Sequence, residues 1–275
     1  MPLHDLISPN DRLIMVVGTY GSGKTEVAVN LAIQLAVDGR RVQLADLDIV
    51  NPYFRSREAR RLMEEHGVRV VIPPGAQAFA DLPIILPEIQ GMLHPPPGIV
   101  TLFDVGGDDV GAKVLSSLRP AIGDSPYELW QVINSRRPFT GTPEGCLEMQ
   151  HAIEESSRLK VTGLLVNSHL IEHTTAQTVL EGWRLALEVA QRSGRPVRCV
   201  AVMEELAGDA ALAEIDAPIL RMQRHMRPPW ISSRRPDNVE PEDELLPAAR
   251  PIPLGKPRPI DMPRSQGEQS GTNRD

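Results

Sequence analysis

The chain has the length and composition of a soluble globular protein with a substantial core. It has 275 residues, 41% of them hydrophobic and 24% charged, with a net charge of −7 and a pI near 5.6. This acidic balance argues against nucleic acid or a membrane surface as a general partner. Because no apolar run could span a bilayer and the first residues lack a signal-peptide pattern, we expect a cytoplasmic protein without stable membrane anchoring.

From Arg12 to about Met222, short β-branched runs alternate with helical patterns. This alternation predicts an α/β fold: a three-layer, doubly wound, mostly parallel sheet of about seven to eight strands, with ligands at the carboxyl ends of the strands. Strands are predicted at 12–17, 41–46, 68–72, 98–104, 127–134, 161–167, 196–202 and 217–221. Helices are predicted at 24–38, 55–66, 108–118, 142–158, 174–193 and 203–213, the fifth beginning at Thr174 or Thr175 and ending at Gly194.

The composition changes near Pro228. The last 48 residues hold ten of the 26 prolines and one aromatic residue, with charges of both signs and no apolar period. Such a segment cannot bury enough surface to offset its ordering entropy. We therefore predict a nucleotide-binding domain over 1–227 and a proline-rich disordered tail over 228–275, in which the sequence around Pro251–Leu254 is an alternative docking motif.

The first predicted strand leads into a glycine-rich turn that opens a helix. Together they aim several backbone N–H groups and the helix dipole at one point, which suits a phosphate group. Lys24 would reach the β- and γ-phosphates, and the Thr25 hydroxyl would hold Mg²⁺. The turn fits G-x-x-x-x-G-K-[ST] and predicts a nucleoside triphosphate site formed by Gly18, Thr19, Tyr20, Gly21, Ser22, Gly23, Lys24 and Thr25.

Two carboxylates, Asp46 and Asp48, follow the second predicted strand. If the extended backbone persists they face the same way, and they could position a water molecule or an outer ligand of Mg²⁺. A turn made by the Asp/Asn-Pro cluster that ends at Pro52 is the alternative. Four arginines come next; one could reach a phosphate across an interface, although a solvated helix face also explains Arg55, Arg57, Arg60 and Arg61.

The strand predicted at 98–104 ends in Asp104 and continues into Gly106 and Gly107. In a chain with a phosphate-binding loop, this aspartate would hold Mg²⁺ through a water, and the Gly107 N–H could bond the γ-phosphate. Capping of the following helix by Asp104 is the alternative. The proline-rich stretch before it, 73–97, carries an apolar patch that could be a helix, a lid or a partner surface.

These motifs, in this order and spacing, resemble the MinD/ParA/Mrp branch of the SIMIBI class of P-loop NTPases over about residues 10–222. In particular, the run 46–52 is similar to the D-A-D-I-x-G-P element of Mrp-type proteins. The resemblance implies that Asp48, with Asp46 as the alternative, belongs to a first switch that places the attacking water. It implies a second switch at Asp104 and Gly107, and an asparagine that reads the adenine edge at Asn167.

The phosphate-binding loop departs from this family at two positions. Where the family has a lysine that reaches into the partner's site across a dimer, this chain has Thr19, and Tyr20 replaces the next glycine. We therefore expect any homodimer to use another surface. The CxxC that Mrp-type proteins often carry is also absent, so the resemblance does not support iron–sulfur loading. Cys146 and Cys199 are far apart, and we predict two buried thiols in a reducing compartment.

Three further features leave their role open. The loop 134–140 lies at a strand end and could line the base site or a partner surface, or be a plain turn. His169 and His173 could share a helix face as metal ligands, although no third ligand is evident and a polar loop explains them. The helical stripe Trp183, Leu187 and Ala190 is predicted to pack in the core.

Three functions remain in competition. The first is a weak ATP hydrolase that acts as a switch, in which Mg²⁺ and ATP order the loops and an unknown partner protein reads the difference. The second is a P-loop kinase or ligase, which needs an acceptor pocket and an arginine lid. The third is a metallochaperone-type GTPase, which normally carries N-K-x-D; here Asn167 is followed by Ser168, His169 and Leu170, so ATP is the predicted nucleotide.

Overall fold

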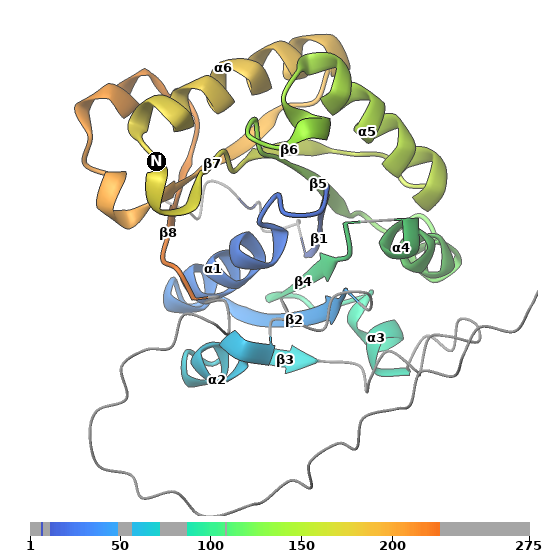
Figure 1. Ribbon diagram of the computed structural model, residues 1–275. Helices are drawn as coiled ribbons and strands as arrows, with labels where there is room; N and C mark the ends of the chain where they lie inside the picture. Colours follow the sequence, from blue (N-terminus) through green and yellow to red (C-terminus); the bar gives the residue numbers. More distant parts are fainter. Residues whose placement is uncertain (1–6, 8–11, 49–56, 72–86, 108, 226–275) are drawn as a thin grey trace, which may run out of the picture. The chain divides into compact units, whose positions relative to one another are not determined.

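The computed structural model describes residues 7, 12–48, 57–71, 87–107 and 109–225. Within these residues, eight parallel strands form one sheet (Figure 1). Their order across the sheet is β3-β2-β4-β1-β5-β6-β7-β8. All eight lie where the sequence predicts strands, which confirms the α/β doubly wound fold. Their bounds are β1 (Leu13–Gly18), β2 (Arg41–Leu47), β3 (Arg69–Val71), β4 (Ile99–Val105), β5 (Glu128–Ile133), β6 (Gly163–Val166), β7 (Val197–Met203) and β8 (Ile219–Met222).

Helices cover both faces of this sheet (Figure 1). Residues of α1 and α2 pack on one face with Ile14 and Val16 of β1. Residues of α3 to α6 pack on the other face with Leu13, Met15 and Val17, because successive strand residues point to opposite sides. The helices are α1 (Lys24–Val37), α2 (Arg57–Glu65), α3 (Pro87–Met92), α4 (Asp109–Ile122), α5 (Pro143–Ser157) and α6 (Ala176–Ser193).

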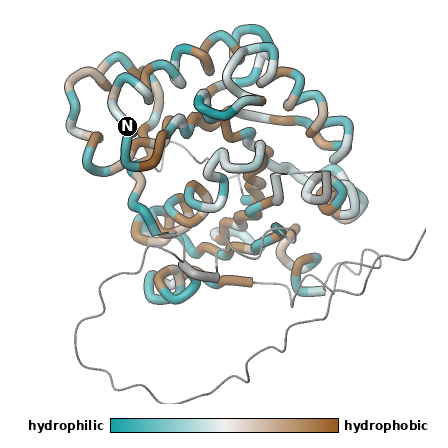
Figure 2. Tube along the Cα trace, viewed as in Figure 1, coloured by the Kyte–Doolittle hydropathy of each residue, from teal (hydrophilic) through white to brown (hydrophobic). Residues whose placement is uncertain are grey.

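The strands are mostly hydrophobic because both faces of the sheet are covered. Figure 2 shows hydrophobic residues concentrated in the central strands and hydrophilic residues along the helices. The two cysteines are buried, as predicted, and lie in the cores on opposite faces of the sheet, Cys146 beside the α4–α6 layer and Cys199 beside the α1–α2 layer. Burial raises the pKa of each thiol to about 12, so both are unreactive at neutral pH.

The ends of α6 follow the sequence signals. The Thr175 hydroxyl accepts from the Thr178 N–H in a capping box, and Gly194 adopts a left-handed conformation with φ 69° at the other end. Within the helix, the predicted packing of Leu187 is wrong, since its side chain is 45% exposed whereas Trp183 is buried. At about 100° per residue Leu187 lies at nearly the same angle around α6 as Ala176 and Leu180, which are buried, so its exposure comes from its position further along the helix and not from the face that it occupies.

The helix predicted at 203–213 is also wrong. The structure has two 3₁₀ turns there, η5 (Glu204–Leu206) and η6 (Ala210–Glu214). Gly208 and Asp209 separate them, and the Asp209 carboxylate accepts from the Ala211 N–H at 2.9 Å, which starts a new turn. The Asp209 side chain thus takes a backbone N–H group as its own donor and interrupts the helix. Hydrophobic periodicity, on which the prediction of a continuous helix rested, does not show this interruption.

Several predictions fall outside the described residues: those on 49–56, including Pro52 and Arg55, on 72–86, on Asp108, and on the tail 228–275 with its domain boundary. Of the apolar patch within 73–97, the described part forms α3, whose Ile89 and Met92 side chains are buried. Within the described ranges, no helix combines the length and apolar character needed to cross a bilayer.

The strand order brings the motifs to one edge of the sheet. β1 lies between β4 and β5, with Val16 in register with Asp104, and Gly18 in register with Val132. β2 lies on the other side of β4 and places Asp46 in register with Asp104. The loops that follow β1, β2, β4 and β5 therefore emerge side by side.

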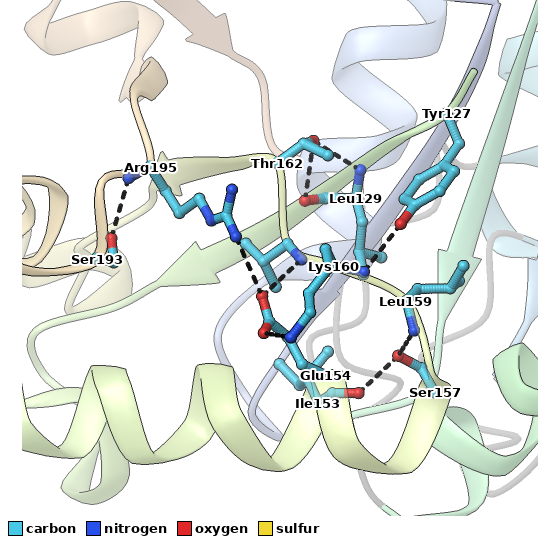
Figure 3. Close-up of polar contacts among 11 residues, drawn as sticks. Tyr127, Leu129, Ile153, Glu154, Ser157, Leu159, Lys160, Thr162, Ser193 and Arg195 are labelled. Carbon is cyan, nitrogen blue, oxygen red and sulfur yellow. Dashed lines mark hydrogen bonds and ion pairs between the residues drawn. The ribbon is translucent and has the colours of Figure 1, made fainter.

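Glu154, near the end of α5, gathers three donors from neighbouring segments (Figure 3). Its carboxylate accepts from the Val161 N–H at 3.0 Å, and lies 2.7 Å from the Lys160 ammonium and 3.8 Å from the Arg195 guanidinium. Burial raises the pKa of Glu154, but these hydrogen bonds and charges outweigh it and hold the pKa below its ordinary value of 4.5. The carboxylate thus ties α5 to the segments that lead into β6 and β7.

Replacing Glu154 with glutamine should lower the free energy of unfolding by about 1 kcal/mol at neutral pH, because the amide can still accept from Val161 but carries no charge. Since the native pKa is depressed, this stabilisation is present above 4.5 and is lost as the pH falls through the native pKa. Urea denaturation at a series of pH values should show the difference vanish in acid. The exposed neighbour Glu155→Gln is the control, and equal losses in both variants would contradict this role.

Candidate functional site

The loop between β1 and α1, residues 18–25, forms a backbone cradle. Gly21 and Gly23 have positive φ values of 72° and 85°, a conformation that glycine adopts without strain. Gly23 is the N-cap of α1 and no side chain caps the helix. The first N–H groups of a helix lack intrahelical acceptors, so this end of α1 is suited to an anion.

Neighbouring segments lie so close to the cradle that Gly18 and Gly23 have no room for a side chain. A Cβ atom on Gly18 would lie 2.8 Å from the Val132 carbonyl oxygen. A Cβ atom on Gly23 would collide with the Asn167 amide, which donates from Nδ2 to the Ser22 carbonyl at 2.8 Å. The predicted base-reading residue therefore lies directly on the phosphate-binding loop, with at most one amide hydrogen and its carbonyl oxygen left for a ligand.

Lys24 is the cation of the cradle. Its side chain is buried, with 7% of the residue exposed, and its ammonium donates to the Thr19 carbonyl at 3.1 Å. A Cβ atom on Gly107 would lie 2.5 Å from the Lys24 ammonium and 2.8 Å from the Tyr20 nitrogen. The turn after β4 is thus in contact with the phosphate-binding loop, and it has no room for a side chain at Gly107.

Three carboxylates lie behind and beside Lys24. Asp104 and Asp46 are buried on adjacent strands, and the Asp46 carboxylate accepts from the Asp48 N–H at 3.0 Å. Burial and, next, the charge of Asp46 raise the pKa of Asp104 to about 8, with a smaller contribution from Asp48; the Thr25 hydroxyl and the Lys24 ammonium oppose the rise. When Asp104 is ionised, the site therefore holds more negative charge than Lys24 alone balances.

This arrangement fits a hard divalent cation. Among the described residues, neither carboxylate oxygen of Asp104 has a hydrogen-bond partner of normal geometry, and the Thr25 hydroxyl approaches the same carboxylate. Oxygen donors of this kind suit Mg²⁺, which usually takes one or two protein ligands and completes its shell with water and phosphate oxygens. No three His, Cys, Asp or Glu side chains in the described ranges form a metal-binding group, so the remaining ligands would come from a bound nucleotide and water.

A cavity of about 1010 Å³ opens beside the cradle, large enough for a nucleotide. The phosphate-binding loop, Asp48, Gly107 and Asn167 are among the residues that line it. Apolar side chains from α6, β7, β8 and the turn after β7 also line it: Val179, Ala201, Met203, Leu206 and Met222.

The two histidines have different surroundings. His169 lines the cavity close to Gly23, and burial, followed by the charges of Arg137 and Arg224, lowers its pKa to about 4. Its imidazole is therefore neutral at physiological pH. His173 is exposed in the 3₁₀ turn η4 (Ile171–His173). Nothing in these surroundings makes the two side chains a ligand pair.

Sequence reasoning left open the contribution of the loop 134–140. The structure places Arg137 against the phosphate-binding loop, where its Nε donates to the Gly21 carbonyl at 2.8 Å. A second arginine, Arg136, points to another partner and pairs with Glu181 on α6. The signal that identifies Arg137 is the adjacency of β1 and β5, and the sequence alone does not supply the strand order.

Asp104→Asn should raise the melting temperature of the protein in the absence of nucleotide and Mg²⁺. The effect should appear above the native pKa of about 8, where Asp104 is ionised: there the amide removes a buried charge next to Asp46 and can donate to that carboxylate, which is worth about 1–2 kcal/mol, and the gain should shrink as the pH falls below 8. Scanning calorimetry in the presence of a chelator measures the change. Asp124→Asn, at an exposed position, is the control; a lower melting temperature for Asp104→Asn would contradict the repulsion between the buried carboxylates.

Comparison with known families gives an independent result for the same region. The family model of the CobQ/CobB/MinD/ParA nucleotide binding domain (CbiA) matches residues 13–181, from β1 into α6. The matched region comprises 169 residues, more than half of the chain, and contains the phosphate-binding loop, the three carboxylates and Asn167.

The individual proteins and structures that resemble the chain share little sequence identity with it. The signal recognition particle 54 kDa protein of Methanopyrus kandleri is 26% identical over 201 residues, which are 73% of this chain and 40% of that protein, so the chain spans about two fifths of the relative's length. Chloroplast FtsY from Physcomitrella patens has a TM-score of 0.49 at 18% identity, covering 71% of this chain and 59% of its own. FtsY from Thermotoga maritima has a TM-score of 0.47 at 21% identity, covering 74% and 65%.

Proposed function

The chain belongs to the CobQ/CobB/MinD/ParA family of P-loop nucleotide-binding domains, and from this premise we propose that it binds ATP with Mg²⁺ and hydrolyses it slowly to control a partner protein. The observation that carries the proposal is the pairing of a backbone anion cradle with buried acids around Lys24. A site that combines an excess of carboxylates with an open anion cradle is suited to an anion and a cation bound together.

In this proposal each residue has a distinct task. The N–H groups of the loop and the Lys24 ammonium bind the phosphates, while Thr25 and Asp104 would hold Mg²⁺, which neutralises phosphate charge when it is bound. Asp48 lines the cavity and would orient the attacking water. Asp46 sets the charge behind Asp104, with which it is in register, and does not itself need to face the cavity.

The turn after β4 would be the moving part of the switch. Gly107 is packed against Lys24 and Tyr20, so a γ-phosphate bound by Lys24 would meet this turn. The turn is coupled to α4 through a second glycine contact, because a Cβ atom on Gly111 would collide with the Gly106 backbone. A shift of Gly106 and Gly107 would therefore displace the start of α4, and a partner protein could read that displacement.

Lys24→Ala should abolish measurable binding of ATP with Mg²⁺ while the protein remains folded. The ammonium contributes charge to the phosphate site and hydrogen-bonds within the loop, so its loss affects the ligand more than the core. Titration calorimetry measures the affinity and circular dichroism the fold. Lys113→Ala, at an exposed position of α4, is the control. Unchanged affinity in the folded Lys24 variant would contradict the phosphate-site assignment.

The base preference follows from the residues near Asn167. No carboxylate stands three positions after Asn167, where guanine-selective proteins of the N-K-x-D type have one; this chain has Leu170. GTP is the alternative because the carboxylates of Glu172 and Glu205 also line the cavity, although Glu172 pairs with Arg224. The structure of the signal recognition particle 54 kDa protein from Aeropyrum pernix K1 is a complex with GDP.

ATP should bind about ten- to a hundredfold more tightly than GTP, because leaving the guanine N1–H and amino group unpaired would together cost about 1–3 kcal/mol. Competition binding with both nucleotides at equal Mg²⁺ concentration measures the ratio. GTP binding tenfold more tightly would overturn the ATP assignment. A Glu205→Gln variant that then loses this preference would identify Glu205 as the guanine-reading group.

A further inference from the structure

The phosphate-binding loop lacks a cation at the position where the lysine-bridged members of this family have one. Thr19 occupies that position and is buried, with 3% of the residue exposed. Its hydroxyl has no hydrogen-bond partner in the part of the chain that the structure describes. A short side chain held in this way cannot extend to a phosphate in a second molecule. If a further positive charge serves the nucleotide, another segment has to supply it.

The loop after β5 brings a cation to the same place within one chain. β5 is hydrogen-bonded beside β1, so residues 134–140 leave the sheet next to the phosphate-binding loop. Internal hydrogen bonds fix this loop: the Asn134 carbonyl accepts from the Arg137 N–H at 3.0 Å and from the Thr140 hydroxyl at 2.7 Å. The Asn134 side chain accepts from the Arg136 N–H at 3.0 Å. Arg137 is therefore presented from a defined backbone.

The guanidinium of Arg137 packs on Gly21. Its Nε donates to the Gly21 carbonyl, and a Cβ atom on Gly21 would lie 3.3 Å from Nε and 3.6 Å from one terminal nitrogen. The side chain is half-buried and lines the cavity. Within the described residues it forms no ion pair with a carboxylate, whereas Arg136 pairs with Glu181. The charge of Arg137 also contributes to the low pKa of His169, so its field reaches into the cavity.

We propose that Arg137 binds the phosphate chain of the nucleotide in cis and supplies the positive charge that Thr19 cannot. The inference rests on the nucleotide-binding function proposed above. One N–H of the guanidinium is used by Gly21, and the terminal N–H groups remain for phosphate oxygens, to which arginine donates in a planar fork. A cation that is already docked on the loop loses little freedom when the nucleotide binds.

The central test compares three variants of the full chain. Arg137→Ala and Arg137→Gln should each lower kcat/KM for ATP hydrolysis at least about tenfold, the scale of a lost charge-assisted hydrogen bond. Arg136→Ala, which removes the neighbouring exposed arginine, should change it less than about twofold. Glutamine can still donate to the Gly21 carbonyl but carries no charge. Wild-type kinetics for Arg137→Gln would mean that Arg137 only braces the loop, and would overturn the proposal.

Two further measurements test whether the lost activity comes from the missing guanidinium group or from misfolding, and whether Arg137 acts on the nucleotide of its own chain or of a second molecule. Millimolar guanidinium added to Arg137→Ala should restore part of the activity, whereas it should not help a variant that is merely misfolded. Mixing Arg137→Ala with Lys24→Ala should give no more activity than the sum of the two alone. Activity above that sum would show that the arginine acts on a second molecule, which contradicts the cis arrangement.

The outcomes distinguish this inference from the function on which it rests. If wild type binds ATP, Lys24→Ala does not, and both Arg137 variants match wild type, the nucleotide site stands and the role of Arg137 fails. If wild type and Lys24→Ala are alike in binding neither ATP nor GTP, the proposed function fails, and the role of Arg137 fails with it.

Discussion

The structure depends on a concentration of like charge at the carboxyl ends of β2 and β4. Asp46 and Asp104 are in register on adjacent strands, both are buried, and the Lys24 ammonium is the cation that opposes them. Such a pair is costly for a ligand-free fold, because burial and repulsion both disfavour the charged forms. In the function proposed here, the favourable binding of Mg²⁺ and a nucleotide offsets the free energy that this buried pair costs the ligand-free protein.

The glycines and the arginine around this charge cluster act together. Gly107 contacts Lys24 from one side, and Gly111 couples that turn to α4. Arg137 closes the opposite side of the loop through Gly21. In the proposed switch, therefore, the phosphates would be held by three segments of one chain, so the response to nucleotide need not wait for a second copy. A partner protein would then read the position of the turn and of α4.

The sequence was sufficient for the fold and for the glycine-rich turn between β1 and α1, and the family model confirms the resemblance to the MinD/ParA proteins. Both features have local sequence patterns: buried parallel strands are mostly apolar runs, and a phosphate-binding loop has glycines at fixed spacing. The sequence was insufficient where the outcome depends on the order of the strands or on a side chain that competes for backbone hydrogen bonds. The contact of Arg137 with Gly21 needs β5 beside β1, and Asp209 breaks the helix expected over 203–213. The exposure of Leu187 depends on how far along α6 the neighbouring segments cover its inner face, since Leu180 at nearly the same angle is buried.

The most direct test of the central claim is the Mg²⁺ dependence of ATP affinity in the wild-type protein, measured by titration calorimetry with Mg²⁺ and with a chelator. If the carboxylates of Asp46, Asp48 and Asp104 require a cation beside the phosphates, then above pH 8, where Asp104 is ionised, they repel ATP alone. The account predicts affinity at least about tenfold weaker without Mg²⁺. Equal affinity under both conditions would show that these carboxylates do not face the bound phosphates, and would contradict the account.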